Sequence, residues 1–291
     1  MQKLPDPNVI HPITGYEKLY TFEGWNMRPS APADMPFKGD TENDARKVFD
    51  SIPELFDKWR PRYSKELFDF VVKTTGLGKG KRCLEIGPGT GQATDFALES
   101  GCDYTSIELG EHLTAFMKKK YSERENFSII NADFEKYDFP SAYYDLVYSA
   151  AAIQWINQDI AYKKCFDIIK AGGYLAMFLV RHNYKDSNLD LYNEIQTAYD
   201  KFFVSDQPYT RKFDYMKAKD YGFSSEEFFD FPGERIFSAD DYIEYIGTNS
   251  DHIKLNENYR DKFFTAVHNA IVRHGNRLVM KDTYVLYLCK K

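Results

Sequence analysis

Residues 82–101 read RCLEIGPGTGQATDFALESG and place three glycines, at 87, 89 and 91, between an apolar run and an amphipathic one. A glycine-rich turn after a strand lets the backbone approach a ligand closely, and the amides that open the following helix favour an anion. The dinucleotide-binding pattern is G-x-G-x-x-G. This turn instead reads G-x-G-x-G, with Glu85 two positions before the first glycine. The spacing argues against a nicotinamide-dependent dehydrogenase.

Strand and helix signals alternate around this turn. Two helices, at 42–59 and 64–76, are predicted to precede it. Strands are predicted at 82–87, 104–109, 127–132, 143–152 and 174–180, with helices at 91–100, 111–120 and 158–170 between them. This alternation predicts an α/β fold with a doubly wound, mostly parallel sheet, whose ligand binds at the carboxyl ends of the strands.

The chain divides into four predicted segments. A proline-rich, irregular arm spans 1–43, and the core spans 44–180. Residues 181–282 are rich in Tyr and Phe and include a predicted strand at 226–237, and the last core strand lies within 283–291. Because 181–282 follows the strand that borders the site, we expect it to form a helical lid. An oligomer interface is the alternative, since aromatic residues serve both roles.

Composition narrows the class of protein. The 291 residues carry a formal net charge of −6 and contain no long Lys/Arg stripe, which argues against a nucleic-acid partner. No signal peptide and no apolar run of membrane-spanning length is present. Four cysteines without a C-x-x-C pair and six histidines without ligand spacing argue against a metal site or a disulfide framework. We therefore expect a cytoplasmic protein, monomeric or homodimeric, with a small-molecule substrate.

The stretch LEIGPGTG resembles the first motif of class I S-adenosylmethionine-dependent methyltransferases. Three later stretches resemble further motifs of that family in order: NADFEKYDF (131–139), YDLVYSAAAIQWI (144–156) and CFDIIKAGGYLAMF (165–178). RPRYSKELFDFV, AAIQWI and the terminal TYVLYLCKK are similar to its trans-aconitate methyltransferase-like, type 11 branch. The resemblance covers about residues 45–180 and implies a seven-stranded Rossmann-like sheet with S-adenosylmethionine as the cofactor.

The same resemblance implies a set of cofactor-binding residues. Glu108 is expected to bind both ribose hydroxyls and Asp133 the adenine amino group, while Arg60 and Tyr63 reach the methionine carboxylate and the sulfonium. For Arg60 and Tyr63 the alternative is that they only tie the N-terminal helices to the sheet. The full set of expected cofactor contacts is Arg60, Tyr63, Glu85, Gly87, Gly89, Gly91, Glu108, Leu109, Asp133, Phe134, Ser149 and Gln154.

Methyl transfer is an in-line displacement, so alignment of donor and acceptor matters most and a base is needed only for a protonated acceptor. The sequence identifies no catalytic base. A carboxylate acceptor would favour Arg181 or Arg211 as its partner, whereas an amine or phenol would favour His182 or a tyrosine of 184–221. The alternative function is a catalytically silent, cofactor-binding sensor or partner subunit.

Overall fold

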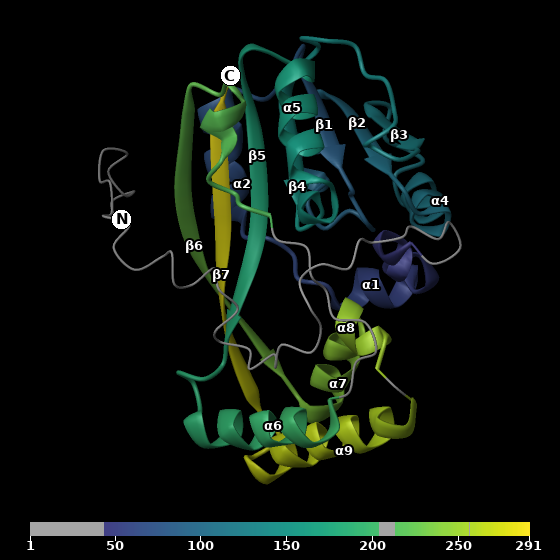
Figure 1. Ribbon diagram of the computed structural model, residues 1–291, viewed down its shortest axis with the longest axis vertical. Coiled ribbons are helices and arrows are strands. Elements are labelled where there is room, and N and C mark those ends of the chain that lie inside the picture. Colours follow the sequence, from purple (N-terminus) through teal and green to yellow (C-terminus); the bar gives the residue numbers. More distant parts are fainter. Residues whose placement is uncertain (1–43, 204–212, 256) are drawn as a thin grey trace. The chain divides into compact units, whose positions relative to one another are not determined.

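The strands form one sheet in the order β3-β2-β1-β4-β5-β7-β6 (Figure 1). The computed structural model describes residues 44–203, 213–255 and 257–291, so the predicted arm at 1–43 lies outside the described residues. All strands are parallel except β7, which runs antiparallel to β5 and β6. The predicted seven-stranded, mostly parallel fold is confirmed. The strands are β1 (Arg82–Ile86), β2 (Asp103–Glu108), β3 (Phe127–Asn131), β4 (Tyr144–Ala150), β5 (Ile169–Asn183), β6 (Ser225–Phe237) and β7 (Leu278–Lys290).

Helices cover both faces of this sheet. The residues buried under α5 and those buried under α2 and α3 form separate clusters on opposite faces. The helices are α1 (Pro53–Trp59), α2 (Lys65–Thr75), α3 (Asp95–Glu99), α4 (Glu111–Lys120), α5 (Gln158–Ile168), α6 (Leu189–Phe202), α7 (Ala239–Gly247), α8 (Ser250–Ile253) and α9 (Glu257–Arg273), with 3-10 turns η2 (Ala45–Ser51), η3 (Ile153–Trp155) and η4 (Ala218–Tyr221).

The central strand β1 fixes the position of the site. It is buried because β2 and β4 flank it on both sides, and its side chains face helices on both faces. The chain winds outward to β2 and β3 on one side of β1 and to β4 on the other. In folds with this strand order, ligands bind where the order reverses, which here is the carboxyl end of β1.

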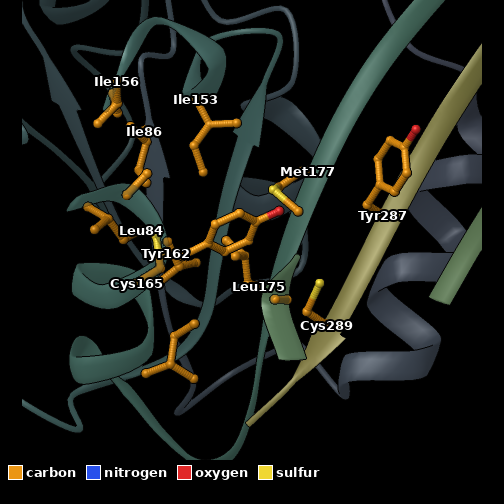
Figure 2. Close-up of a cluster of buried hydrophobic side chains, with 14 of the residues drawn as sticks. Leu84, Ile86, Ile153, Ile156, Tyr162, Cys165, Leu175, Met177, Tyr287 and Cys289 are labelled. Carbon is orange, nitrogen blue, oxygen red and sulfur yellow. The ribbon is translucent and has the colours of Figure 1, made fainter. Parts of the chain in front are cut away.

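Figure 2 shows side chains of the cluster on the α5 face, to which Leu84, Tyr162, Met177 and Tyr287 belong. These side chains come from β1, α5, β5 and β7, and each is at most 1% exposed. Full burial of one large apolar side chain stabilises a fold by about 1.5–3 kcal/mol. The cluster therefore holds segments together that lie far apart in the sequence.

Two predicted helices differ in the structure. The helix predicted at 42–59 is split: the Asp44 side chain caps η2, and α1 begins anew at Pro53. Proline has no N–H and disfavours a helical residue before it, and Ile52 has φ −135° and ψ 43°. The helix predicted at 91–100 is limited to α3. In contrast, α2 begins after Ser64, whose side chain caps Leu67 N–H, and ends at Gly76 in the left-handed conformation, as predicted.

The last strands are longer than the sequence predicts. β5 continues to Asn183, and β7 begins at Leu278 instead of 283. β4 ends opposite Phe178, whereas the ladder of β5 with β7 continues to the pair Asn183 and Lys281. In Figure 1 α6 and α9 lie at the far ends of these extended strands. Polar residues at 181–183 hide the extension from a hydrophobic pattern.

Candidate functional site

The glycine turn after β1 requires glycine at each of its three positions. Gly87, Gly89 and Gly91 have φ angles of 65°, 59° and 92°, a region that other residues rarely adopt. A Cβ atom at Gly87 would lie 2.6 Å from that of Ala152, and one at Gly89 would lie 2.9 Å from Cε1 of Phe56. The glycines therefore let neighbouring side chains lie directly against the backbone of the turn.

A buried carboxylate lies below the turn. Oε2 of Glu85 accepts hydrogen bonds from the hydroxyls of Thr94 (2.6 Å), Tyr104 (2.5 Å) and Tyr148 (2.9 Å). Oε1 is also buried, but in the described part of the chain it has no hydrogen-bond partner. Burial raises the pKa of Glu85, although the three hydroxyls oppose this shift. Glu85 thus retains an unsatisfied acceptor, which fits an N–H donor or a cation.

Glu108 ends β2 beside the turn, as the sequence predicts. Its Oε2 accepts from the backbone N–H of Gly89 (3.2 Å) and its Oε1 from that of Gly110 (2.9 Å). Only 7% of Glu108 is exposed. Burial raises its pKa from 4.5 to about 7, against the effect of the two backbone donors. The carboxylate is therefore held at the carboxyl edge of the sheet and can change charge near neutral pH.

A segment that the sequence did not assign to the site covers this edge. We call residues 44–59 the capping segment. Arg46 donates to both carboxylate oxygens of Asp133 (3.2 and 3.0 Å), and Asp50 accepts from the backbone N–H of Leu113 (2.9 Å). Phe56 lies against Gly89. The spacing of Arg46 and Asp50, one turn apart in a predicted helix, was the available signal for these contacts.

Four other residues predicted to bind the cofactor make contacts within the fold in this structure. Ser149 Oγ donates to the Ile86 carbonyl (3.0 Å) and ties β4 to β1. The Gln154 side chain donates to the Ala151 carbonyl (2.9 Å) and accepts from the Tyr215 hydroxyl (3.1 Å). Leu109 is half-buried next to Glu108 and Phe134 is buried in the core. Their assignment to the cofactor stays a prediction.

Arg60 is separated from the turn by the ring of Phe56, whereas Tyr63 packs in the core beside β5. The Arg60 guanidinium donates to the Asn249 side chain (2.6 Å) and lies 5.6 Å from the ring centroid of Phe56. Tyr63 is buried against Phe178, with 5.6 Å between the ring centroids, and burial raises its pKa. Both residues line an open cavity of about 600 Å³.

A polar cluster joins the extended strands to α7. His182 Nδ1 lies 2.7 Å from Asp282 Oδ1 and His182 Nε2 lies 2.9 Å from the Tyr245 hydroxyl, while Arg235 Nε donates to Asp282 Oδ2 (2.5 Å). Burial alone would raise the pKa of Asp282, but the hydrogen bonds from His182 and Arg235 lower it. Each partner comes from a different strand or helix. The cluster therefore fixes α7 on the sheet.

Of the two cations predicted to bind a carboxylate acceptor, the structure describes only Arg181. Arg181 donates to the Tyr287 hydroxyl (3.3 Å) and lies over the Phe228 ring, on the face of the sheet away from His182. Arg211 lies outside the described residues. Within the described residues, no group of three His, Cys, Asp or Glu side chains is arranged to hold a metal ion. None of the helices there is long and apolar enough to cross a membrane.

Comparison with known families agrees with this geometry. Residues 84–177, which include the glycine turn, Glu108 and Asp133, match the family described as "Methyltransferase domain". Over these residues the match supports a class I S-adenosylmethionine-dependent methyltransferase domain of the type 11 branch. The glycine turn, the unsatisfied oxygen of Glu85 and the carboxylate of Glu108 fit its nucleoside cofactor.

Curated relatives of the methyltransferase domain differ in their acceptors. A malonyl-(acyl-carrier protein) O-methyltransferase from Marinomonas sp. is 27% identical over 44% of this chain and 48% of the relative. A ribosomal RNA small subunit methyltransferase A from Hahella chejuensis is 32% identical over 26% of this chain and 28% of the relative. A demethylmenaquinone methyltransferase from Staphylococcus aureus is 23% identical over 68% and 84%. The chain thus spans about half or less of the first two relatives.

Solved structures share the fold of this domain. Phosphoethanolamine N-methyltransferase 2 of Haemonchus contortus, in complex with phosphomonomethylethanolamine and S-adenosylhomocysteine, has a TM-score of 0.52 at 16% identity, over 85% of this chain and 58% of that one. The cyclase SpnF has a TM-score of 0.51 at 15% identity, over 86% and 97%. These likenesses concern the fold alone, because the identities are low and the two proteins are named for different reactions.

Proposed function

We propose that this chain transfers a methyl group from S-adenosylmethionine to a small-molecule acceptor, at an oxygen of a carboxylate or hydroxyl, or at a nitrogen. The observation that carries the proposal is the glycine turn at the end of β1 next to the buried carboxylate of Glu108. When bound, S-adenosylmethionine supplies an electrophilic methyl group on its sulfonium sulfur. The residues of the chain bind and align the two reactants.

Two carboxylates of the site would exchange a partner seen here for one on the nucleoside. Glu108 would accept from ribose hydroxyls in place of a backbone N–H, and Asp133 would accept from the adenine amino group in place of Arg46. Ser149, Gln154, Leu109 and Phe134 would hold the walls of this cleft. The capping segment must move away from Asp133 and Gly89 as the nucleoside enters.

Two observations support a small acceptor: the net charge of the chain and the share of the chain that each relative matches. The chain carries a formal net charge of −6, which repels a phosphate backbone. The rRNA methyltransferase relative matches over only 26% of the chain, so this likeness concerns the domain and says little of the acceptor. The relative that matches over 68% of the chain is named for demethylmenaquinone, which is not a macromolecule, whereas the one that matches over 44% is named for a malonyl group carried on a protein. The free, buried thiols of the four cysteines fit a reducing cytoplasm.

Incubation of the full chain with methyl-labelled S-adenosylmethionine tests the proposal. One set of reactions contains a panel of small carboxylates, phenols and amines, and a second contains total RNA. Calorimetric titration with S-adenosylhomocysteine runs in parallel. We expect saturable binding of the cofactor product and label in at least one small acceptor. Label in RNA would contradict the small acceptor, and binding without any transfer would favour the silent sensor or partner subunit.

A further inference from the structure

The open cavity that Arg60 and Tyr63 line carries an excess of positive charge. Its lining residues include four cationic ones, Lys58, Arg60, Arg62 and Arg235, and one acidic one, Asp241. This balance is opposite to that of the whole chain, which has a formal net charge of −6. Its volume of about 600 Å³ is in the range of small-ligand sites. Cations gathered in a cavity of an acidic protein point to an anionic ligand.

The four cations differ in how far their charge is already balanced. Arg62 pairs with Asp57 (2.8 Å), and Arg235 is bound to the buried carboxylate of Asp282. Neither Lys58 nor Arg60 has a carboxylate partner in the described part of the chain. Arg60 donates only to the neutral amide oxygen of Asn249 (2.6 Å). Lys58 lies 4.6 Å from the ring centroid of Trp59. Lys58 and Arg60 are therefore the two cations available to an anion.

Two contacts connect this cavity to the edge that holds the glycine turn. Phe56 lies between them, since its ring touches Gly89 on one side and the Arg60 guanidinium on the other. Tyr63 packs on Phe178, whose carbonyl accepts from the backbone N–H of Ala151 directly after β4. A molecule in the cavity is thus separated from the cofactor edge by single side chains. Movement of Phe56 with the capping segment would let a molecule in the cavity reach the cofactor edge.

The chemistry of the cavity favours an anchor over a reacting group. A carboxylate or phosphate paired with a guanidinium gives its lone pairs to hydrogen bonds, so it is a weaker nucleophile than a free one. The aromatic walls, which include Tyr63, Phe237 and Tyr284, can bury the carbon skeleton of the same molecule. An anion held here would leave another group of that molecule to face the glycine turn.

We infer that this cavity binds an anionic group of the methyl acceptor, a carboxylate or a phosphate, through Arg60 and Lys58. The inference rests on the proposed function and adds a substrate class to it: small acceptors with an anionic anchor in addition to the methylated atom. It also gives Arg60 a different partner from the methionine carboxylate that the family resemblance implies.

Anion binding to the full chain, saturated with S-adenosylhomocysteine, tests this inference. Succinate and inorganic phosphate serve as probes and distinguish the two anchor chemistries, and neutral succinamide is the matched control ligand. The variants are Lys58→Gln and Arg60→Gln. Lys73→Gln is the control, since it removes one charge from an exposed position on α2. Calorimetry measures both the probe and the cofactor product.

We expect saturable binding of succinate or phosphate, a loss of about tenfold in probe affinity for each of the two variants, and no such loss for Lys73→Gln. Succinamide should not bind. The inference is wrong if neither anion binds, if succinamide binds equally well, or if Arg60→Gln weakens the cofactor product and leaves the probes unchanged. Absence of S-adenosylhomocysteine binding would instead contradict the proposed function, so the two failures are distinguishable.

Discussion

Polar residues gather in two regions of the sheet, and the two regions form differently. The first is the carboxyl edge of β1, β2 and β4, and the second is the extension of β5, β6 and β7. At the first, Gly89 lies in the turn after β1, Glu108 ends β2 and Asp133 lies just after β3, so parallel pairing brings these strand ends to one edge. At the second, His182, Arg235 and Asp282 meet only because long strands pair beyond the end of β4. The first site leaves a local signal in the sequence, whereas the second depends on long-range register.

The largest expected effect concerns the second region. Asp282→Ala removes a fully buried carboxylate and leaves Arg235 and His182 without it. Breaking a buried ion pair in this way costs about 3–5 kcal/mol. Chemical unfolding should show this loss, whereas Asp230→Ala, an exposed position on neighbouring β6, should stay within about 0.5 kcal/mol. Equal stability of the two variants would mean that the polar cluster does not hold the extension.

The next largest effect concerns the first region, where Glu108 should make the stability depend on pH. Because burial raises the pKa of Glu108 from 4.5 to about 7, the folded state favours its protonated form. Its ionisation therefore lowers stability progressively as the pH rises from about 4.5 to 7, by about 3 kcal/mol in total. Unfolding curves across this range should show the loss in the unmodified chain, while Glu108→Ala should lack it. A parallel pH dependence in both would contradict the buried environment of Glu108.

These regions also show what a sequence can predict. Glu108 and the three glycines lie where their pattern places them, because strand ends and turns are local features. Arg46 was missed because its partner Asp133 lies 87 residues away. Nothing in the pattern links Arg60 to Asn249, or Arg235 to His182. Such contacts follow from how α1 and α7 dock on the sheet, which depends on tertiary packing and not on periodicity.

Cofactor affinity gives a third comparison. Glu108→Ala should weaken S-adenosylhomocysteine by about 1.5–3 kcal/mol, the usual contribution of hydrogen bonds to a charged group. Glu111→Ala is the matched control, since this glutamate is exposed in the first turn of α4. Calorimetric titration measures both. Unchanged affinity in a folded Glu108→Ala protein would remove the ribose assignment.

A substitution in the capping segment should have a smaller effect and should raise the affinity for S-adenosylhomocysteine. Arg46 and Asp133 are 20% and 13% exposed, and their ion pair must open if Asp133 is to accept from the adenine amino group. Arg46→Met should therefore tighten S-adenosylhomocysteine binding by up to about 1 kcal/mol. The same titration checks this. Weaker binding would show instead that Arg46 contacts the nucleoside.

A crystal structure of the full chain with S-adenosylhomocysteine bound tests the central claim most directly. We expect ribose hydroxyls on Glu108, the adenine amino group on Asp133 with Arg46 displaced, and the sulfur on the side of the cavity lined by Arg60. A nucleoside bound elsewhere, with Arg46 still on Asp133 and Phe56 still on Gly89, would contradict it.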